Sequence, residues 1–417
     1  MEVVHASCAG IDVHKRDVKV CLVWRDAPGK RQQEVRTFRT MTPDLLALRD
    51  WLQAHGCREL ALESTGVYWQ PVYNLLEGDF QVLLVNPAHI KHVPGRKTDV
   101  KDCEWIAERL EHGLLRGSFI PPRAIRDLRE LTRYRRKVVQ TRSAEVNRLQ
   151  KILESANIKL ASVATDIMGV SGRAMLAALL AGEQDPAKLA ELSKGRLRNQ
   201  KAELQAALQG RWRAHPAQLL SEILAHIDVL DESLERLEAQ IDEACRPYAL
   251  QLEHLDTMTG WAKRSAQDLI AEIGVEMSFF PDQKHLAGWA RICPGNNESG
   301  GKRHSGRTGQ GNPWLRAILV ECAHAAGHTK DTYLGQLYRH FAARKGKQRA
   351  AIAVGHSMLE AAYFILRDHV PYKELGPQHL DRIHVDQTIR YHLRRLEALG
   401  VKVDVKSRPE TELPVAV

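Results

Sequence analysis

Four acidic side chains stand where a carboxylate is costly unless something binds it. Asp12 lies within the apolar run AGIDV, and Glu63 closes the run ELALE. Asp99 and Asp102 are spaced i and i+3 at the start of an expected helix, so they share one of its faces. Carboxylates in or at the end of strands are disfavoured unless they are paired or bound to a metal. If the four meet, they form the oxygen-rich site that Mg²⁺ prefers, where Mn²⁺ can substitute.

Each acid also has an ordinary structural explanation. Asp12 can begin a turn with His14, and Glu63 can cap the polar stretch that follows it. Asp99 and Asp102 suit the positive end of a helix dipole. Singly, these explanations are as good as a metal site, but jointly, within an α/β domain, the acids favour metal binding. Two bound ions would stabilise the attacking and leaving oxygens of an in-line phosphoryl transfer.

A second candidate site is the polar, glycine-rich sequence GWARICPGNNESGGKRHSGRTGQGNPWLR, residues 288–316. Ser299 precedes two glycines, which let the backbone approach a phosphate closely. Nearby cations suit the charge of a phosphoryl transition state: Lys302, Arg303, Arg307 and Arg316. Composition alone favours a plainer role, a solvated basic loop on the DNA backbone with Ser299 as a turn residue. No histidine or aspartate stands beside Ser299, so a nucleophilic serine needs activation from the carboxylate site, in its own or a neighbouring subunit.

The composition indicates a nucleic-acid partner. The chain has 417 residues, enough for two or three domains, and carries a net charge of +9. Basic residues concentrate between Lys91 and Lys151 and between Arg291 and Arg316, as contact with a phosphate backbone requires. No apolar run approaches a membrane span and no signal peptide is evident, so we expect a cytoplasmic protein. The seven irregularly spaced cysteines indicate neither a disulfide framework nor a zinc site, and most are expected to be buried apolar residues.

The acids must be positioned by the N-terminal elements. Hydrophobic alternation predicts strands at residues 8–13, 17–24, 34–40, 59–63 and 80–85. Pro43 opens a helix to about His55, with Thr42 as its expected cap, and a further helix is expected from Asp99 to Gly113. These elements predict an α/β domain with a mixed sheet, over residues 1–122.

The remainder is predicted to be mainly helical. Residues 123–250 contain a heptad seam, which suits an antiparallel hairpin within one chain or, as we favour, pairing between protomers; it is formed by Ile223, Ile227, Leu230, Leu234, Leu237 and Ile241. Residues 251–380 begin with two short helices around Gly260, a helix-hairpin-helix-like unit whose amides can meet a phosphate. Residues 381–417 hold a basic helix, from Asp386 to Leu399, and a tail expected to be disordered.

Three stretches carry a family resemblance: GIDVHKRDVKVCLV, ALESTGVYWQPVYNLLE and NPAHIKHVPGRKTDVKDCEWIAERLEHGLLRGSFIPP. They resemble the N-terminal domain of the DEDD insertion-sequence transposases, the recombinases associated with a bridge RNA. That domain is RuvC-like and has the ribonuclease-H fold. The four DEDD positions are matched, in order, by Asp12, Glu63, Asp99 and Asp102. The resemblance continues in GVSGRAMLAALLAGE and from Leu255 to about Tyr372, so it covers most of the chain.

The serine segment is similar to the family's C-terminal signature P-x-x-x-x-S-G-G-K-x-R-x-G. This resemblance implies that Ser299 is the nucleophile. Ser305 is a rival, because it follows His304 at a place where the chain departs from the expected Lys/Arg-x-x-Gly pattern. The resemblance further implies a structured guide RNA, in addition to donor and target DNA.

The sequence therefore predicts an α/β plus all-α fold: a ribonuclease-H/RuvC-like domain, a long helical coiled-coil middle and a mainly helical transposase domain. The predicted function is that of a DNA transposase, a Mg²⁺-dependent recombinase that forms a phosphoserine–DNA intermediate under RNA guidance. Nucleic acid is expected to contact Lys97 and the cations near Ser299, and the protein is expected to form a dimer or tetramer. Two alternatives stay open: a junction-resolving endonuclease that uses water, and a non-catalytic nucleic-acid-binding scaffold.

Overall fold

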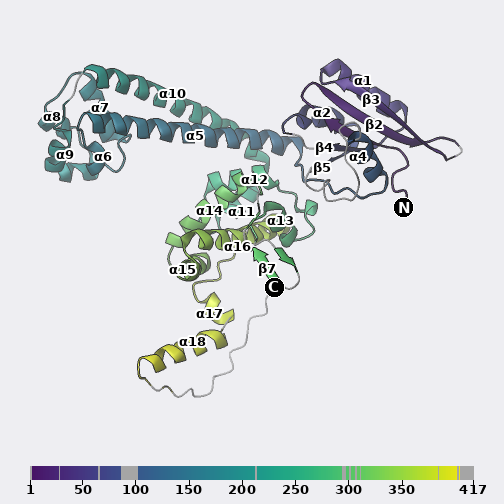
Figure 1. Cartoon of the computed structure of the whole chain (residues 1–417). Helices are drawn as coiled ribbons and strands as arrows, with labels where there is room; N and C mark the ends of the chain where they lie inside the picture. The colour runs from purple at the N-terminus through teal and green to yellow at the C-terminus, as the bar shows by residue number, and fades with distance from the viewer. Residues whose placement is uncertain are drawn as a thin grey trace. The chain divides into compact units, whose positions relative to one another are not determined.

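In the computed structural model the chain forms two compact units, Met1–Ile120 and Pro121–Val417 (Figure 1). The structure describes residues 2–27, 29–63, 66–85, 102–211, 214–293, 297–299, 302–305, 308–309, 311–383, 385–401 and 403. For residues 214, 297–299, 302–305, 381, 383 and 386–388 it describes the backbone alone. Each unit is described by itself below.

The first unit is built on a five-stranded sheet in the order β3-β2-β1-β4-β5. β2 runs antiparallel to β1 and β3, whereas β4 runs parallel to β1 and β5. The mixed, ribonuclease-H-like sheet that the sequence predicts is therefore confirmed. Its strands are β1 Cys8–Val13, β2 Asp17–Arg25, β3 Arg31–Arg39, β4 Glu59–Glu63 and β5 Gln81–Val85. Its helices are α1 Thr42–Ala54, α2 Trp69–Leu76 and α4 Asp102–Glu111.

The start of β3 and the start of α1 differ from expectation. β3 begins at Arg31 because it pairs with β2 over its whole length, which extends the strand through a polar stretch without alternation. Thr42 is the first residue of α1, and its expected side-chain cap is wrong: the capping position is Met41, which has no side-chain hydrogen bond there. The first residues of the helix expected from Asp99 lie outside the described residues.

Alternate residues of β1 face opposite sides of the sheet. Ala9, Ile11 and Val13 are fully buried in one core with residues of α1 and α2. Cys8 belongs to a second core, on the side of α4. Gly10 and Asp12 share the side of Cys8, so this second face is the one that carries the candidate acid.

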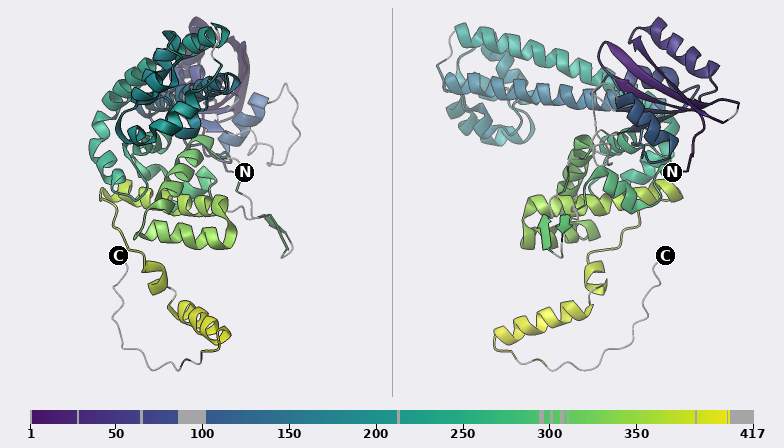
Figure 2. Two further views of the ribbon diagram at one scale, coloured as in Figure 1. Left: turned by 90° about the vertical axis from the view of Figure 1, so that its left-hand side faces the viewer. Right: turned by 45° about the vertical axis from the view of Figure 1, so that its right-hand side comes forward.

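The second unit begins with two long helices, α5 Arg123–Ser155 and α10 Ala214–Cys245. They lie side by side in Figure 1 and Figure 2. Arg142 pairs with Asp231, and His226 lies 3.5 Å from Glu145, so the two helices are antiparallel. Seam residues Ile227 and Ile241 are fully buried. The seam thus packs within one chain, and our preference for pairing between protomers along it is corrected.

Short helices close the far end of this hairpin around a separate apolar core: α6 Leu160–Val163, α7 Val170–Leu180, α8 Pro186–Glu191 and α9 Lys201–Leu208. α7 follows Gly169, and α8 begins at Pro186, a residue type favoured in the first turn of a helix. The long helices α5 and α10 also contribute to this core, for example with Leu149 and Leu220, which are fully buried.

The chain ends in further helices and one small hairpin. The helices are α11 Ala249–Asp256, α12 Lys263–Ile273, α13 Gln283–Ala290, α14 Pro313–His328, α15 Tyr333–Lys345, α16 Lys347–Asp368, α17 His379–Ile383 and α18 Val385–Ala398. The hairpin strands, β6 Asn297–Ser299 and β7 Lys302–Ser305, were not predicted. The expected tail lies outside the described residues.

The turn between α11 and α12 packs against α14. Gly260 has φ +87°, and a Cβ there would lie 2.5 Å from the carbonyl oxygen of Cys322. Only glycine fits such a close approach, so this glycine has a packing role.

All seven cysteines are free and six are buried, as expected. Within the described part of the chain, no helix has the length and apolar character needed to cross a membrane.

Candidate metal centre and serine hairpin

Asp12 and Glu63 lie side by side at the ends of neighbouring parallel strands. Ile11 pairs with Leu62, so the next residue of each strand is an acid. Neighbouring strands are about 4.8 Å apart. Asp12 is 5% exposed and Glu63 is 8% exposed. Two buried carboxylates this close repel each other, and a cation that neutralises both relieves that cost.

α4 lies directly against β1 at Gly10. A Cβ on Gly10 would stand 2.3 Å from the nitrogen of Ala107 and 2.4 Å from the carbonyl oxygen of Cys103. No side chain fits there, so glycine is required at this strand position for the helix to dock. The sequence offered no signal for this contact beyond a glycine within a strand pattern.

The direction of α4 brings its first residue to the acid pair. At its far end, the carbonyl oxygen of Glu111 accepts a hydrogen bond from the nitrogen of Val4, ahead of β1 (2.9 Å). α4 therefore runs opposite to β1, and Asp102 lies at the end where Asp12 stands. Burial and, next, the charge of Asp12 raise the pKa of the Cys103 thiol to about 11, which also places Asp12 beside the first turn of α4.

The structure thus gathers three of the four predicted acids at one end of one sheet face. Asp99 and Lys97 lie outside the described residues. Within the described ranges, no group of three or more histidine, cysteine or acidic side chains is close enough to hold a metal ion. The donor chemistry nevertheless fits a hard divalent cation, because carboxylate oxygens are its preferred ligands. His14 adds a neighbour: its Nε2 lies 3.1 Å from Oδ2 of Asp12.

Gly10→Ala is expected to destabilise the first unit by about 2 kcal/mol, since overpacking costs about 1–3 kcal/mol. The added methyl group collides with the backbone of α4 rather than with a flexible side chain. Thermal unfolding would measure the loss. Gly78→Ala is the matched control, because a Cβ at Gly78 meets nothing within 4 Å. Equal stability of the two variants would contradict the docking of α4 described above.

Ser299 is the last residue of β6 and pairs with Lys302 across the hairpin turn. Its rival Ser305 pairs with Asn297, at the opposite end of the two strands. The two serines therefore differ in position: Ser299 stands at the tip and Ser305 at the stem. Lys302 and Arg303 belong to β7, whose backbone alone is described, and Arg307 lies outside the described residues.

Arg316, in α14, holds together the two ends of the segment that carries Ser299. Its Nη2 donates to the carbonyl oxygen of Arg291 (2.7 Å) and to that of Gly309 (2.6 Å). A Cβ on Gly309 would stand 2.7 Å from the Arg291 side chain, so the two ends touch. Contact of Arg316 with nucleic acid stays a prediction, but its Nη2 already donates hydrogen bonds to two backbone carbonyl oxygens.

A buried carboxylate, Glu272, joins three parts of the second unit. It is 1% exposed and accepts two hydrogen bonds from Arg133 of α5, at 2.7 and 2.8 Å. It also accepts one from Asn312 Nδ2 (2.5 Å), whose own side-chain oxygen caps the start of α14. Arg129 lies 3.5 Å away. The end of the serine segment is thereby attached to α5 and α12.

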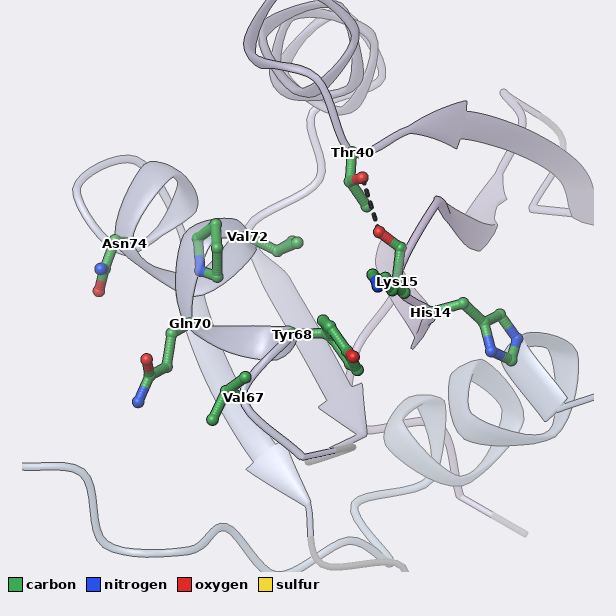
Figure 3. Close-up of a pocket in the computed structure, with 9 residues that line it drawn as sticks. His14, Lys15, Thr40, Val67, Tyr68, Gln70, Val72 and Asn74 are labelled. Atoms are coloured by element: carbon green, nitrogen blue, oxygen red, sulfur yellow. Dashed lines mark hydrogen bonds between the residues drawn. The ribbon is translucent and has the colours of Figure 1, made fainter.

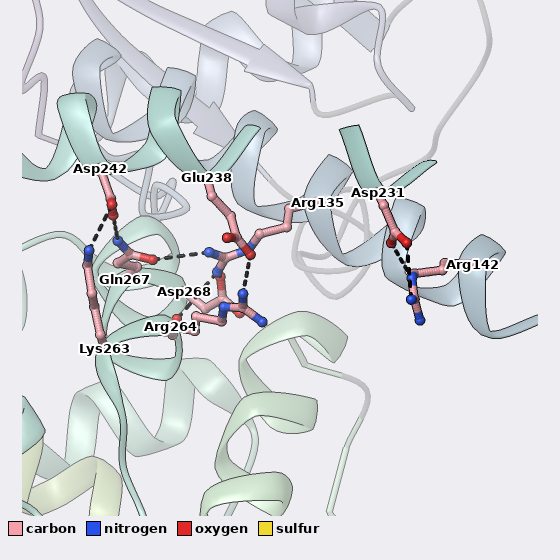
Figure 4. Close-up of polar contacts among 9 residues, drawn as sticks. All are labelled: Arg135, Arg142, Asp231, Glu238, Asp242, Lys263, Arg264, Gln267 and Asp268. Atoms are coloured by element: carbon pink, nitrogen blue, oxygen red, sulfur yellow. Dashed lines mark hydrogen bonds and ion pairs between the residues drawn. The ribbon is translucent and has the colours of Figure 1, made fainter. Parts of the chain in front are cut away.

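Arg135 of α5 makes a second set of polar contacts with α12 (Figure 4). Arg135, 5% exposed, donates to Asp268 (2.6 Å) and to Gln267 (3.1 Å). Gln267 in turn donates to Asp242 of α10 (2.7 Å). The ion pair of Arg135 with Asp268 was missed at the sequence level, because its partners are more than a hundred residues apart and no local pattern marks them.

Glu272→Ala is expected to destabilise the second unit by about 3–5 kcal/mol, because the largely buried Arg129 and the half-buried Arg133 lose their carboxylate. Burial already lowers the pKa of Arg129 to about 10, so this side chain stays charged at neutral pH and bears the full cost. Urea unfolding would measure the change. Glu253→Ala, at an exposed position of α11, is the control and should change stability little. A loss no larger than that of the control would contradict the account.

Comparisons with known proteins agree with this architecture. Residues 9–158 match the transposase model DEDD_Tnp_IS110, and residues 252–339 match the model described as "Transposase IS116/IS110/IS902 family". An uncharacterized 42 kDa protein of insertion element IS900 from Mycobacterium paratuberculosis is 26% identical over 396 residues, which cover 87% of this chain and 96% of that protein. The transposase for insertion sequence element IS1111A from Coxiella burnetii is 22% identical over 299 residues, covering 70% and 72%.

The two family matches, on a ribonuclease-H-like domain followed by a mainly helical region, identify a DEDD transposase. Such a protein is a DNA phosphoryl-transfer enzyme, binds DNA and requires a divalent metal. The two matched segments together cover more than half of the chain. The chain belongs to the IS110 family of transposases.

Proposed function

We propose that the protein cuts and rejoins the DNA of an insertion sequence by way of a covalent phosphoserine intermediate. Asp12, Glu63, Asp99 and Asp102 hold Mg²⁺, as two ions, and Ser299 is the nucleophile. The observation that supports this proposal most is the side-by-side placement of Asp12 and Glu63, both buried, on neighbouring strands. Buried like charges are retained in a fold where a cation uses them.

The proposed reaction exchanges one phosphate ester for another. Oγ of Ser299 attacks a DNA phosphorus; the Oγ–P bond forms, the bond from phosphorus to a deoxyribose oxygen breaks, and that oxygen takes up a proton as the serine loses one. A hydroxyl of a second DNA end then attacks the phosphoserine and releases Ser299. The bound ions supply Lewis-acid stabilisation of the phosphoryl charge. The acids position those ions, and the cations of the serine segment bind the DNA backbone: Lys302, Arg303, Arg307 and Arg316.

The hairpin supports Ser299 over Ser305. A tip residue followed by two glycines lets a phosphate approach the hydroxyl closely. Ser305 lies at the stem, next to the segment end that Arg316 closes. We therefore propose that Arg316 keeps the hairpin in place, in addition to any contact it makes with DNA.

The remaining assignments rest on the sequence patterns and, for the guide RNA, on the family resemblance. A structured guide RNA directs the exchange, Lys97 contacts nucleic acid, and the enzyme acts in the cytoplasm as a dimer or tetramer. The functional parts are residues 1–122 for metal binding, 123–250 for assembly, 251–380 for the serine chemistry, and the basic region 381–417. Since four of the six seam residues of α10 are buried within their own chain, we expect assembly to use other surfaces as well.

A trapping experiment tests the proposal. The wild-type protein is incubated with Mg²⁺, guide RNA copurified with it and nicked insertion-sequence ends, which prevent rejoining, and the adduct is digested and mapped by mass spectrometry. A DNA-linked peptide containing Ser299 is the expected result. An adduct on Ser305 would assign the chemistry to the stem of the hairpin. Cleavage without any adduct would instead establish the water-using endonuclease.

A further inference from the structure

The first unit has an open pocket of about 520 Å³ next to the acids (Figure 3). One side is formed by the turn after β1 and the end of β3, with His14, Lys15 and Thr40. The other side is formed by the beginning of α2, with Val67, Tyr68 and Gln70. The volume is within the range of about 300–1,000 Å³ that is usual for sites that bind small ligands.

The pocket adjoins the candidate metal centre through His14. This side chain lines the pocket, and its Nε2 lies 3.1 Å from Oδ2 of Asp12. On the other side, Val67 and Tyr68 follow β4 shortly after Glu63. The pocket lining therefore begins two residues after Asp12 and four residues after Glu63, so a ligand in the pocket would lie near the phosphate that we propose these acids act on.

The pocket wall on the β1 side is held in place by hydrogen bonds. Thr40 Oγ1 donates to the carbonyl oxygen of Lys15 (3.0 Å), as Figure 3 shows. The nitrogen of His14 donates to the carbonyl oxygen of Asp17 (2.9 Å). Lys15 itself is exposed and lines the pocket, so a fixed backbone presents a solvent-accessible cation that a phosphate can meet.

The lining combines the groups that recognise an unpaired nucleotide. Tyr68 is 40% exposed and Val67 is 65% exposed, so both side chains are accessible to a ligand. In Figure 3 the Tyr68 side chain lies between Lys15 and Gln70. An exposed aromatic ring stacks on a base, and an amide such as that of Gln70 matches the hydrogen-bonding edge of a base. A base still paired within a duplex cannot enter a pocket of this kind, whereas an extruded one can.

We infer that this pocket binds one unpaired nucleotide of the DNA strand being cut, with its base on Tyr68 and its phosphate toward Lys15 and His14. The inference rests on the proposed DNA strand cleavage at the neighbouring acids. It adds a specificity site to that reaction: the enzyme acts where a nucleotide next to the cleaved phosphate has left the double helix.

Photo-crosslinking tests the inference without requiring cleavage. The full-length protein is irradiated in Ca²⁺ with single-stranded DNA that contains one 5-iododeoxyuridine, with the same DNA as a duplex, and with the matching RNA that contains 5-iodouridine. The expected crosslinked peptide contains Tyr68. Tyr68→Ala should lower the yield about tenfold, Tyr68→Phe should keep it, and Tyr134→Ala, at an exposed position of α5, should leave it unchanged.

Three results would overturn the inference: a peptide that lacks the segment around Tyr68, a yield as high with the duplex as with the single strand, or crosslinking to RNA alone. The last result would assign the pocket to an RNA. Because the readout is binding, it also separates this inference from the proposed function. Crosslinking at Tyr68 by a protein that forms no serine adduct would keep the pocket and reject the serine mechanism.

Discussion

Asp12→Asn is expected to lower the rate of DNA strand cleavage by about a thousandfold, a loss of on the order of 4 kcal/mol in transition-state stabilisation. The substitution keeps the size of the side chain but removes the charge that pairs with a cation. Glu63→Gln is expected to have the same effect, because the two carboxylates are neighbours on β1 and β4. Cleavage of labelled insertion-sequence ends under single-turnover conditions measures both.

Glu59→Gln is the matched control, since Glu59 begins the same strand and faces the same side of the sheet as Glu63. It should cleave DNA at the wild-type rate.

The thermal stability of Asp12→Asn gives a second readout. In EDTA, Asp12→Asn should be at least as stable as wild type, because it removes the repulsion between two buried charges, whereas added Mg²⁺ should raise the Tm of wild type alone. Normal cleavage by Asp12→Asn would refute the assigned role of this acid.

Ser299→Ala is expected to abolish the covalent protein–DNA adduct and, with it, strand exchange, a loss of more than about a thousandfold. The folded state should be unaffected, because Ser299 stands at the tip of a small hairpin, and Arg316 binds the flanking Arg291 and Gly309 rather than this serine. Gel analysis of trapped reactions measures the adduct. Ser305→Ala, in the same hairpin, should keep it.

Mixing two inactive proteins tests whether one reaction uses residues of two subunits. Ser299→Ala supplies intact acids, and Asp12→Asn supplies an intact serine. Partial recovery of strand exchange in the mixture indicates a site shared between protomers. If no ratio of the two restores activity, each protomer acts with its own acids and serine. An adduct that forms normally on Ser299→Ala would remove this serine from the mechanism altogether.

The sheet was largely predictable from the sequence because its signals are local. Strand runs such as CAGIDV and ELALE are short, apolar and bounded by turn residues, and their acids stand out against that background. The order of the strands in the sheet and their register could be known only from the structure. Because Ile11 pairs with Leu62, the two acids that follow them are neighbours. Because Gly10 has no side chain, α4 can pack against β1 and place Asp102 at the same end of the sheet.

The second unit was less predictable because its contacts are distant in sequence. The seam of α10 was recognisable, but a heptad pattern does not say whether its partner is another protomer or, as found, α5 of the same chain. No sequence pattern distinguishes Glu272 from an ordinary helix residue, and its role follows only from the hydrogen bonds that Arg133 and Asn312 donate to it. Arg316 was assigned to DNA by its charge, whereas its observed hydrogen bonds are to backbone carbonyls.

The β6–β7 hairpin was missed for a different reason. Its strands are three and four residues long and polar, so neither alternation nor β-propensity marks them. The pair of glycines after Ser299 was read as a site for phosphate approach, but the same glycines also suit a tight hairpin turn. The hairpin places Ser299 at its tip and Ser305 at its stem, a difference in position that the sequence does not show.

A crystal structure of the protein grown in Mn²⁺, with an anomalous difference map, tests the assigned metal centre most directly. The account predicts a strong peak about 2.0–2.2 Å from carboxylate oxygens of Asp12 and Glu63, with Asp102 and Asp99 completing or adjoining its coordination. A map in which Mn²⁺ lies elsewhere, while Asp12 and Glu63 bind only protein groups, would contradict it.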